Sequence, residues 1–299
     1  MAASRIQGVR LLNQPATPSP AFRQPDFTLP LGACDTHCHI LGPVARFPYA
    51  DSRPYTPAES GKTVLSALHE RIGVDRTVIV QATVYGSNNR IVLDAIADRP
   101  QTRRGVALID AGTSDADLQA LHDGGIRAVR FGFIRHLWVP PDPTMFHRLM
   151  ERIALFGWHV LLHVDATGLD DLQPLLDALP VPFVIDHMGR IDAAGGLAQP
   201  GFVRLLEWAR RDHCWVKVSA IDRLSATGAP FADVAPFVRA LIDASPDRLL
   251  WGTDFPHPNP RHPVADDADL VDVLPLCGDA DAMQKLLVDN PARLYGFID

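Results

Sequence analysis

The sequence has no long apolar segment, few cysteines and no excess of basic residues. No apolar run approaches the roughly 18 residues that a membrane-spanning helix needs, and the first 20 residues lack the apolar core of a secretory signal. Four cysteines in 299 residues are too few for a disulfide framework. A net charge of −7 argues against a general nucleic-acid binder. We therefore expect a cytoplasmic protein with no membrane or nucleic-acid partner.

A Gly-rich dinucleotide-binding loop is also missing after every apolar run, which weakens the case for an open doubly wound sheet. Hydrophobic residues make up 47% of the chain, enough for a large core. Residues 1–30 are rich in Pro, Gln and Ser, and they lack periodicity. We expect them to form an N-terminal arm that packs on the rest of the chain or on a neighbouring subunit, or a partly disordered tail. Residues 31–299 are expected to form one domain.

Eight short apolar runs alternate with amphipathic stretches after residue 31. Each run is rich in Val, Ile and Leu, as are strands that are covered on both faces. The runs are residues 34–39, 77–84, 105–110, 126–133, 159–164, 182–187, 215–221 and 249–255. Helical patterns occupy residues 114–123, 142–156, 202–211, 234–244 and 281–294. This alternation predicts a single (β/α)₈ TIM barrel, with an open doubly wound sheet as the alternative.

Several of these runs end in side chains that can bind a metal ion or transfer protons. Catalytic groups of such barrels lie at the C-terminal ends of strands, and alternate residues of a strand share a face. His37 and His39 should therefore point into the barrel mouth, whereas Cys34 and Cys38 should face the helices. The full set is His37, His39, His163, His187 and Asp254. Such nitrogen and oxygen ligands suit Zn²⁺ or a similar ion, although one histidine at one strand end is more often structural.

Asp254 has two possible roles: it can take a proton from water, or it can hold a histidine in place. Arginines are also expected near the strand ends, where their guanidinium forks suit carboxylate or sulfonate oxygens. These arginines are Arg130, Arg135, Arg190 and Arg223. The alternative is that some of them pair with acidic side chains of the protein, namely Asp186, Asp192 or Asp222.

Several segments resemble the amidohydrolase superfamily. They are CDTHCHILGP, FPYADSRPYTP, VIVQATVYGSNNR, VRFGFI, VIDHMGR, DRLSATG, WGTDFPHPN and LLVDNPARLYGF. Together they are similar to its branch that contains 2-pyrone-4,6-dicarboxylate lactonase and 4-sulfomuconolactone hydrolase, over nearly all of residues 33–297. The resemblance implies a carboxylic ester hydrolase that opens a small anionic lactone in aromatic-compound catabolism.

The resemblance also implies roles for individual residues. His37, His39 and His187 would polarise the lactone carbonyl, directly or through a metal ion, and Asp254 would be the general base for water. The positions expected to contact the substrate are Tyr55, Thr83, Arg130, Arg135, His136, Arg223 and Asn259.

Two positions depart from the lactonase pattern. His163 stands where the lactonase has Tyr, which restores the strand-5 histidine of metal-dependent amidohydrolases, and His136 stands where it has Arg. Both changes favour a lactone such as a sulfomuconolactone and leave the pyrone open. We expect at most one divalent metal ion, with zinc first, because Arg130 occupies the position of a bridging Lys or Glu and a guanidinium cannot bridge metals. The expected ligands are the His and Asp set named above, and metal-free catalysis is the alternative.

Other functions are compatible with the same residues. A metal-dependent decarboxylase would release CO₂, and a lactone isomerase of the same branch would yield an isomeric lactone. A non-catalytic barrel that binds acidic metabolites would show no turnover. The sequence leaves the oligomeric state open between a monomer and a small homo-oligomer.

Overall fold

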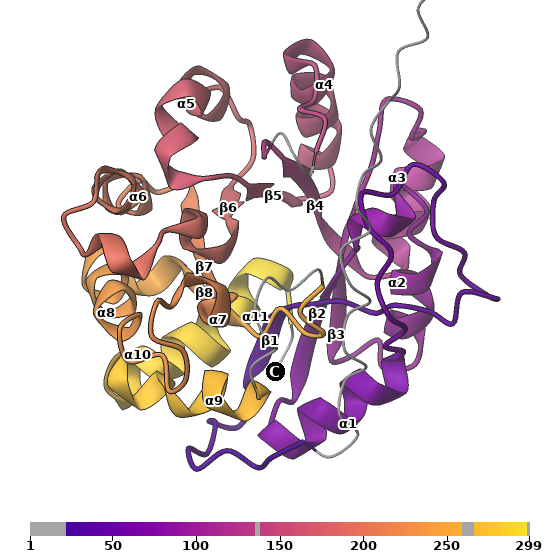
Figure 1. The fold of residues 1–299 in the computed structure, drawn as a ribbon. Helices are drawn as coiled ribbons and strands as arrows, with labels where there is room; N and C mark the ends of the chain where they lie inside the picture. The colour runs from indigo at the N-terminus through magenta and orange to yellow at the C-terminus, as the bar shows by residue number, and fades with distance from the viewer. Residues whose placement is uncertain (1–21, 135–137, 259–265, 298–299) are drawn as a thin grey trace, which may run out of the picture.

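Eight parallel strands surround the centre of the molecule, and helices cover them on the outside (Figure 1). The structure is a computed structural model that describes residues 22–134, 138–258 and 266–297. The strands are β1 (Cys34–Cys38), β2 (Arg76–Val80), β3 (Arg103–Ala107), β4 (Ile126–Gly132), β5 (His159–His163), β6 (Phe183–Ile185), β7 (Cys214–Ser219) and β8 (Leu249–Gly252). They follow one another in sequence order, each parallel to the next.

The first and last strands meet just beyond their carboxyl ends. The Asp254 amide donates to the His37 carbonyl at 2.7 Å, and the His39 amide donates to the Phe255 carbonyl at 2.7 Å. A Cβ atom at Gly252 would lie 2.6 Å from the His37 nitrogen, so only glycine permits this approach. The predicted (β/α)₈ barrel is therefore confirmed.

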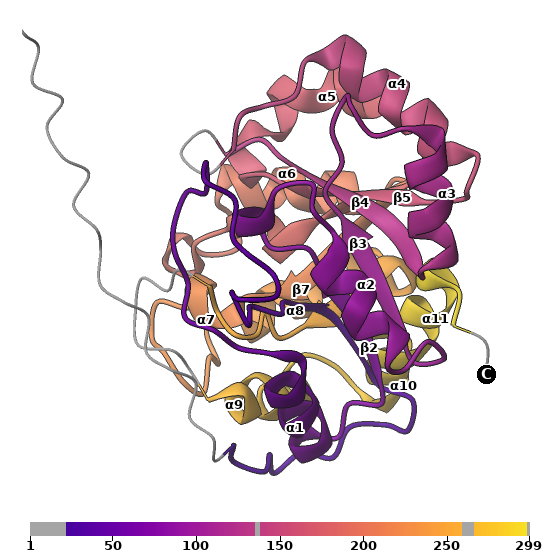
Figure 2. The same ribbon diagram turned by 90° about the vertical axis from the view of Figure 1, so that its right-hand side faces the viewer.

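Helices follow the strands and form the outer ring, as Figures 1 and 2 show from two sides. They are α1 (Lys62–Ile72), α2 (Arg90–Ala97), α3 (Asp115–Asp123), α4 (Pro143–Ala154), α5 (Leu169–Asp177), α6 (Pro200–Ala209), α7 (Ile221–Leu224), α8 (Ala235–Ala244), α9 (Asp267–Asp272), α10 (Ala280–Gln284) and α11 (Asn290–Tyr295). Short 3₁₀ segments are η1 (Thr83–Tyr85), η2 (Ala166–Gly168), η3 (Asp186–Arg190), η4 (Ala193–Gly195), η5 (Pro246–Arg248) and η6 (Leu274–Leu276). The helix predicted over residues 281–294 is interrupted by a π-helical turn, η7 (Lys285–Asp289).

Several strands end earlier than predicted. Strand β2 ends at Val80, and Thr83 lies in η1 rather than in the strand. Strands β6 and β8 stop before His187 and Asp254, whose φ angles are 54° and 65°. Left-handed backbone at these two residues is incompatible with a strand. His187 and Asp254 are therefore held by the turns that leave these strands.

The orientation of the cysteines in β1 was predicted only in part. All four cysteines of the chain are free and buried. Cys38 packs in the layer between strands and helices, as predicted, but Cys34 lies inside the barrel with Val78 and Tyr295. The register between β1 and β2 shifts between Asp35 and Cys38, so the alternation of faces is broken there. The prediction for Cys34 was wrong for this reason.

The described part of the N-terminal segment is attached to the barrel. Arg23 forms ion pairs with Asp269 (2.7 Å) and Asp272 (2.8 Å) of α9. The ring of Phe22 lies 6.0 Å from that of Phe255, in the turn after β8. Residues 1–21 of the predicted arm lie outside the described residues.

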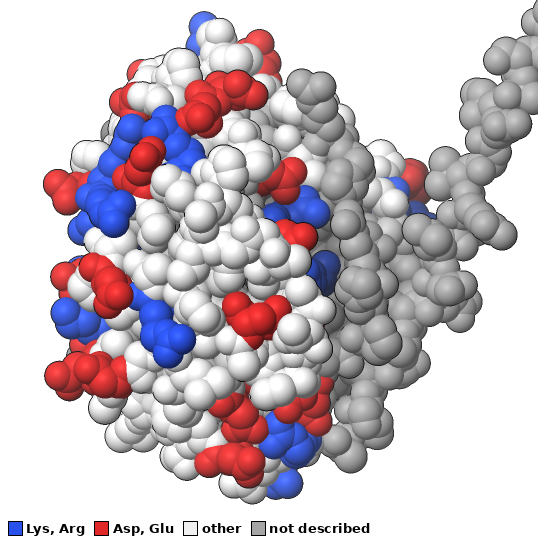
Figure 3. All heavy atoms as spheres, turned by 60° about the vertical axis from the view of Figure 1, so that its left-hand side comes forward, with Lys and Arg blue, Asp and Glu red and all other residues white. Residues whose placement is uncertain are grey.

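The surface carries charges of both signs. On the face shown in Figure 3, Lys and Arg side chains are interspersed with Asp and Glu, and no broad basic patch is visible. Among the described residues, no helix combines the length and apolar character needed to cross a membrane.

Candidate active site

Four side chains predicted at three strand ends, His37 and His39 at the end of β1, His187 after β6 and Asp254 after β8, converge at the barrel mouth. The Asp254 Oδ1 atom lies 3.3 Å from His39 Nε2 and 3.7 Å from His37 Nε2. The rings of His37 and His187 are 4.5 Å apart. All four residues are buried, so their charges and hydrogen bonds act with little screening by water.

Backbone and side-chain contacts orient the histidines. His39 Nδ1 lies 2.8 Å from the Val80 carbonyl, which can only accept, so Nδ1 carries a proton. His187 Nδ1 lies 2.8 Å from the Ser219 hydroxyl. Burial lowers the pKa of His187 to about 4, against the influence of Asp254 and Asp186. At neutral pH this imidazole is therefore neutral and has one nitrogen lone pair.

Asp186 neutralises three cationic or proton-donating groups beneath the site. Its oxygens lie 2.8 Å from Arg130 Nε, 3.3 Å from His37 Nδ1 and 3.5 Å from Lys217 Nζ. Burial raises the pKa of Asp186, but Arg130 and its other positive neighbours hold the pKa well below the usual range. Asp186 is therefore ionised at neutral pH. Arg130 pairs with Asp186, as the alternative interpretation held, and its guanidinium also lies 3.4 Å from His187 Nε2.

Lys217 is a member of the site that the sequence analysis missed. It is fully buried, and its ammonium lies 3.0 Å from the Thr36 carbonyl and 3.3 Å from His37 Nδ1. Burial lowers its pKa, although Asp186 acts in the opposite direction. A lysine in the middle of the apolar run WVKVSAI was the available signal, because a charged side chain is rarely buried without a partner.

Arg223 lies against Asp254 from the turn after β7. One guanidinium nitrogen is 3.0 Å from Asp254 Oδ2 and donates to the Pro258 carbonyl at 2.9 Å. Burial raises the pKa of Asp254, but Arg223, followed by His187, holds that pKa well below its usual range. Asp254 is therefore ionised at neutral pH.

Tyr55 is a described substrate-contact candidate whose electrostatic neighbours include Thr83, Arg130 and Arg223. Burial raises the pKa of Tyr55, a hydrogen bond to Thr83 lowers it, and Asp254 and the two arginines are close enough to act on it in opposite directions. Arg135, His136 and Asn259 lie outside the described residues. Arg190 pairs with a carboxylate, as the alternative interpretation held, but the partner is Asp165 at 3.3 Å.

His163 closes the other side of the site at the end of β5. Its ring lies 5.4 Å from that of His187. Its Nδ1 atom accepts a hydrogen bond from the Trp138 indole at 3.0 Å. Burial, followed by Arg130, lowers the pKa of His163 well below its usual value, so the ring is neutral.

The donor set fits a divalent metal ion in part. Ligand atoms of His37, His187 and Asp254 all lie within 4.8 Å of one another, and His37 Nε2 is buried without a hydrogen-bond partner. The 3.3 Å between His39 Nε2 and Asp254 Oδ1 matches the roughly 3.3 Å expected between two ligands of a tetrahedral zinc ion. The structure thus contains candidate ligand groups for one ion at the mouth.

A second acid and imidazole pair, Asp35 and His69, lies below the site. Its polar atoms are engaged in hydrogen bonds within the protein. Asp35 accepts hydrogen bonds from the His37 amide (2.9 Å) and from the amide and hydroxyl of Thr253 (3.1 and 2.6 Å). Its Oδ2 atom is also 3.0 Å from His69 Nε2. These bonds join β1, the turn after β8 and α1, and they fix the strand end that carries His37 and the turn that carries Asp254.

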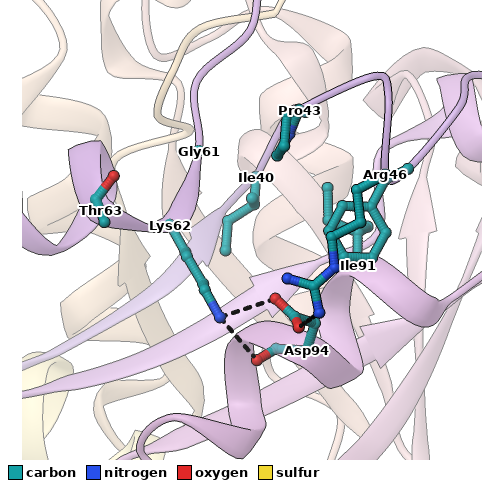
Figure 4. A pocket seen from close by; sticks show the side chains of 10 residues that line it. Ile40, Pro43, Arg46, Gly61, Lys62, Thr63, Ile91 and Asp94 are labelled. Atoms are coloured by element: carbon teal, nitrogen blue, oxygen red, sulfur yellow. Dashed lines mark hydrogen bonds and ion pairs between the residues drawn. The ribbon is translucent and has the colours of Figure 1, made fainter.

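A cavity of about 200 Å³ lies apart from these residues, beside the start of α1 (Figure 4). Its lysine, Lys62, pairs with Asp94 at 2.8 Å and with Asp98 at 2.7 Å. None of the predicted site residues lines this cavity.

His257 lies in the turn after β8, where its amide donates to the Asp254 carbonyl at 2.7 Å. The structure buries it between Asp222 (3.4 Å) and Asp267 (3.1 Å). Burial lowers its pKa, but the charge of Asp267 and hydrogen bonds to both carboxylates raise it to about 10. His257 is therefore an imidazolium that joins the turn after β8 to α7 and α9.

Replacing His257 with Asn is expected to lower the free energy of unfolding by about 1–3 kcal/mol at pH 6, because two carboxylates lose their shared cation. The folded-state pKa of about 10 exceeds the usual 6.5, so this stabilisation is complete below pH 6.5 and is lost as the pH rises through 10. Urea unfolding at several pH values measures it. If the difference in free energy of unfolding between wild type and variant stayed constant from pH 6 to 10, the positive charge assigned to His257 would be contradicted.

Comparison with known proteins identifies the class to which this barrel and site belong. The model of the amidohydrolase family matches residues 34–297, so the chain belongs to that family. It is 44% identical over 284 residues to a 2-pyrone-4,6-dicarboxylate hydrolase of Comamonas testosteroni, covering 91% of this chain and 92% of the relative. It is 38% identical over 276 residues to a 4-sulfomuconolactone hydrolase of Rhizobium radiobacter, covering 91% and 92%. A solved structure from Agrobacterium tumefaciens superposes with a TM-score of 0.79 at 29% identity, covering 91% of this chain and 98% of that one.

Proposed function

We propose that this protein is a lactone hydrolase that opens a small anionic lactone ring of the 2-pyrone-4,6-dicarboxylate or 4-sulfomuconolactone type, in aromatic-compound catabolism. The observation that carries the proposal is the buried Asp254 carboxylate, which lies against His37, His39 and Arg223. The two relatives named above are both lactone hydrolases by name, and they match this chain over nine-tenths of its length.

Each residue has a defined task in the reaction. Arg130 and Arg223 bind acid groups of the substrate, assisted by Tyr55 and Thr83 and, as the sequence suggests, by Arg135, His136 and Asn259. Asp254 takes a proton from water, and the resulting hydroxide attacks the lactone carbonyl carbon. His37, His39 and His187 polarise the carbonyl oxygen as negative charge develops on it: His37 and His187 directly or through a bound metal ion, and His39, whose Nε2 atom carries a lone pair, through such an ion. The bond to the ring oxygen then breaks, Asp254 returns its proton to that oxygen, and the new carboxyl group loses its remaining proton to solvent.

We further propose that His37, His39, His187 and Asp254 hold one divalent metal ion, with zinc as the first choice. A bound ion would supply Lewis acidity at the carbonyl oxygen. The sequence also suggested His163 as a ligand. The hydrogen bond from Trp138 to His163 affects whether this side chain can bind an ion. Metal analysis of the purified protein, before and after dialysis against a chelator, tests the ion separately from the reaction.

Product analysis tests the reaction. Purified protein is incubated with 2-pyrone-4,6-dicarboxylate and with 4-sulfomuconolactone, and products are identified by mass spectrometry in H₂¹⁸O. Hydrolysis adds one water and places one ¹⁸O in the new carboxylate. Release of CO₂ would identify a decarboxylase, and a product of unchanged mass would identify an isomerase. Binding of both lactones without turnover would identify a non-catalytic barrel.

A further inference from the structure

The contact between Trp138 and His163 determines which nitrogen of His163 carries the proton. An indole N–H can only donate, so His163 Nδ1, 3.0 Å away, must accept. A neutral imidazole with an accepting Nδ1 carries its proton on Nε2. The polar atom that His163 has left for the barrel mouth is therefore an N–H donor, and a protonated nitrogen has no lone pair for a metal ion.

The position of Trp138 is itself built into the fold. The residue lies just beyond β4, and its amide donates to the Ile134 carbonyl at 2.9 Å. A side chain at Gly132 would overlap the indole, so glycine at the end of β4 makes room for it. The Arg130 guanidinium lies 5.7 Å from the centre of the ring. The indole is thus held between an arginine of the site and the histidine that it orients.

The neighbours of His163 favour an anionic oxygen as the acceptor. Arg130 lies on the adjacent strand, and Arg223 lies across the mouth against Asp254. A neutral N–H beside the Arg130 guanidinium adds a directed hydrogen bond where negative charge is already attracted. A metal ion is disfavoured at this position, because Nε2 of His163 carries a proton and has no lone pair to offer.

We propose that Trp138 is a positioning residue that fixes His163 as an Nε2–H donor to a carboxylate or sulfonate oxygen of the substrate, and so keeps His163 out of the metal-ligand set. This inference deepens the proposed function and rests on it for the identity of the ligand. The tautomer itself is independent of turnover.

The test is two-bond ¹H–¹⁵N NMR on protein labelled at histidine, without substrate, at neutral pH. His163→Gln assigns the signal by its disappearance. Wild type should show His163 protonated on Nε2 alone, and Trp138→Phe, which keeps an aromatic ring but lacks the N–H, should show a mixture of tautomers. A proton on Nδ1 in wild type overturns the proposal, whether or not the protein hydrolyses lactones.

Binding gives a second measurement. Pyridine-2,4-dicarboxylate, a planar dianion that cannot be hydrolysed, is titrated by calorimetry. Trp138→Phe should raise its Kd about two- to threefold, because only part of the His163 population then carries the Nε2 proton that the ligand needs. An unchanged Kd overturns the substrate role. Zinc content should be the same in wild type and His163→Gln, and loss of zinc in that variant overturns the exclusion from the ligand set.

The chain contains a matched control. Trp158 donates to His122 Nδ1 at the same distance, 3.0 Å, outside the active site. Trp158→Phe should change the tautomer of His122 and leave both the His163 signal and the Kd unchanged. Equal weakening of binding in the two variants would show a general loss of packing and would overturn the specific role of Trp138.

Discussion

Replacing Asp254 with Asn is expected to lower kcat for lactone hydrolysis by roughly 10²–10⁴-fold, the usual contribution of a positioned general base. The amide keeps the size and planarity of the carboxylate but has almost no proton affinity. The Asp254 backbone bond to His37, at 2.7 Å, does not involve the side chain, so the turn after β8 should keep its shape. Initial rates at saturating lactone measure the change.

Stability separates a catalytic role from a structural one. In the Asp254→Asn variant Arg223 loses its ion pair, but a third of that side chain is exposed (34%), so water can solvate its charge. The free energy of unfolding of this variant should therefore differ little from that of the wild type. Asp247→Asn, which breaks an exposed pair with Lys285, is the control and should retain full activity. Near-wild-type turnover in Asp254→Asn would show that Asp254 is not the general base.

The barrel could be predicted from the sequence because each strand is a short apolar run between helices. Parallel strands covered on both faces need no alternation, and their carboxyl ends meet on one side. This rule alone placed His37 and Asp254, more than two hundred positions apart, at one mouth, where the structure finds them 3.7 Å apart. Face alternation failed at Cys34, because a register shift in β1 leaves no sequence signal.

The charges beneath the mouth could not be predicted in the same way. Arg130, Asp186 and Lys217 come from β4, the turn after β6, and β7, and nothing local in the sequence shows that they meet. The pairing of His257 with Asp267 likewise depends on how the turn after β8 folds back on α9. Sequence patterns indicate which strand end a residue occupies, whereas the partner of a buried charge is decided by packing across the barrel.

This buried cluster gives the largest expected effect on stability. Asp186→Asn should lower the free energy of unfolding by roughly 3–5 kcal/mol, the usual loss when one partner of a buried ion pair is removed. Asp186 is fully buried and contacts both Arg130 and Lys217, so the neutral amide leaves two positive charges without compensation. Urea unfolding followed by tryptophan fluorescence measures the loss.

The same control, Asp247→Asn, should cost at most about 1 kcal/mol, because both partners of that pair are in contact with water. Removing Asp186 together with its partner Arg130 provides the sharper comparison. The double variant Arg130→Met, Asp186→Leu should be more stable than Asp186→Asn alone, since it leaves only the Lys217 ammonium without a carboxylate instead of two buried cations, yet it should not bind the substrate acid group. Equal destabilisation of the single and double variants would mean that Asp186 acts through its shape and hydrogen bonds rather than through its charge.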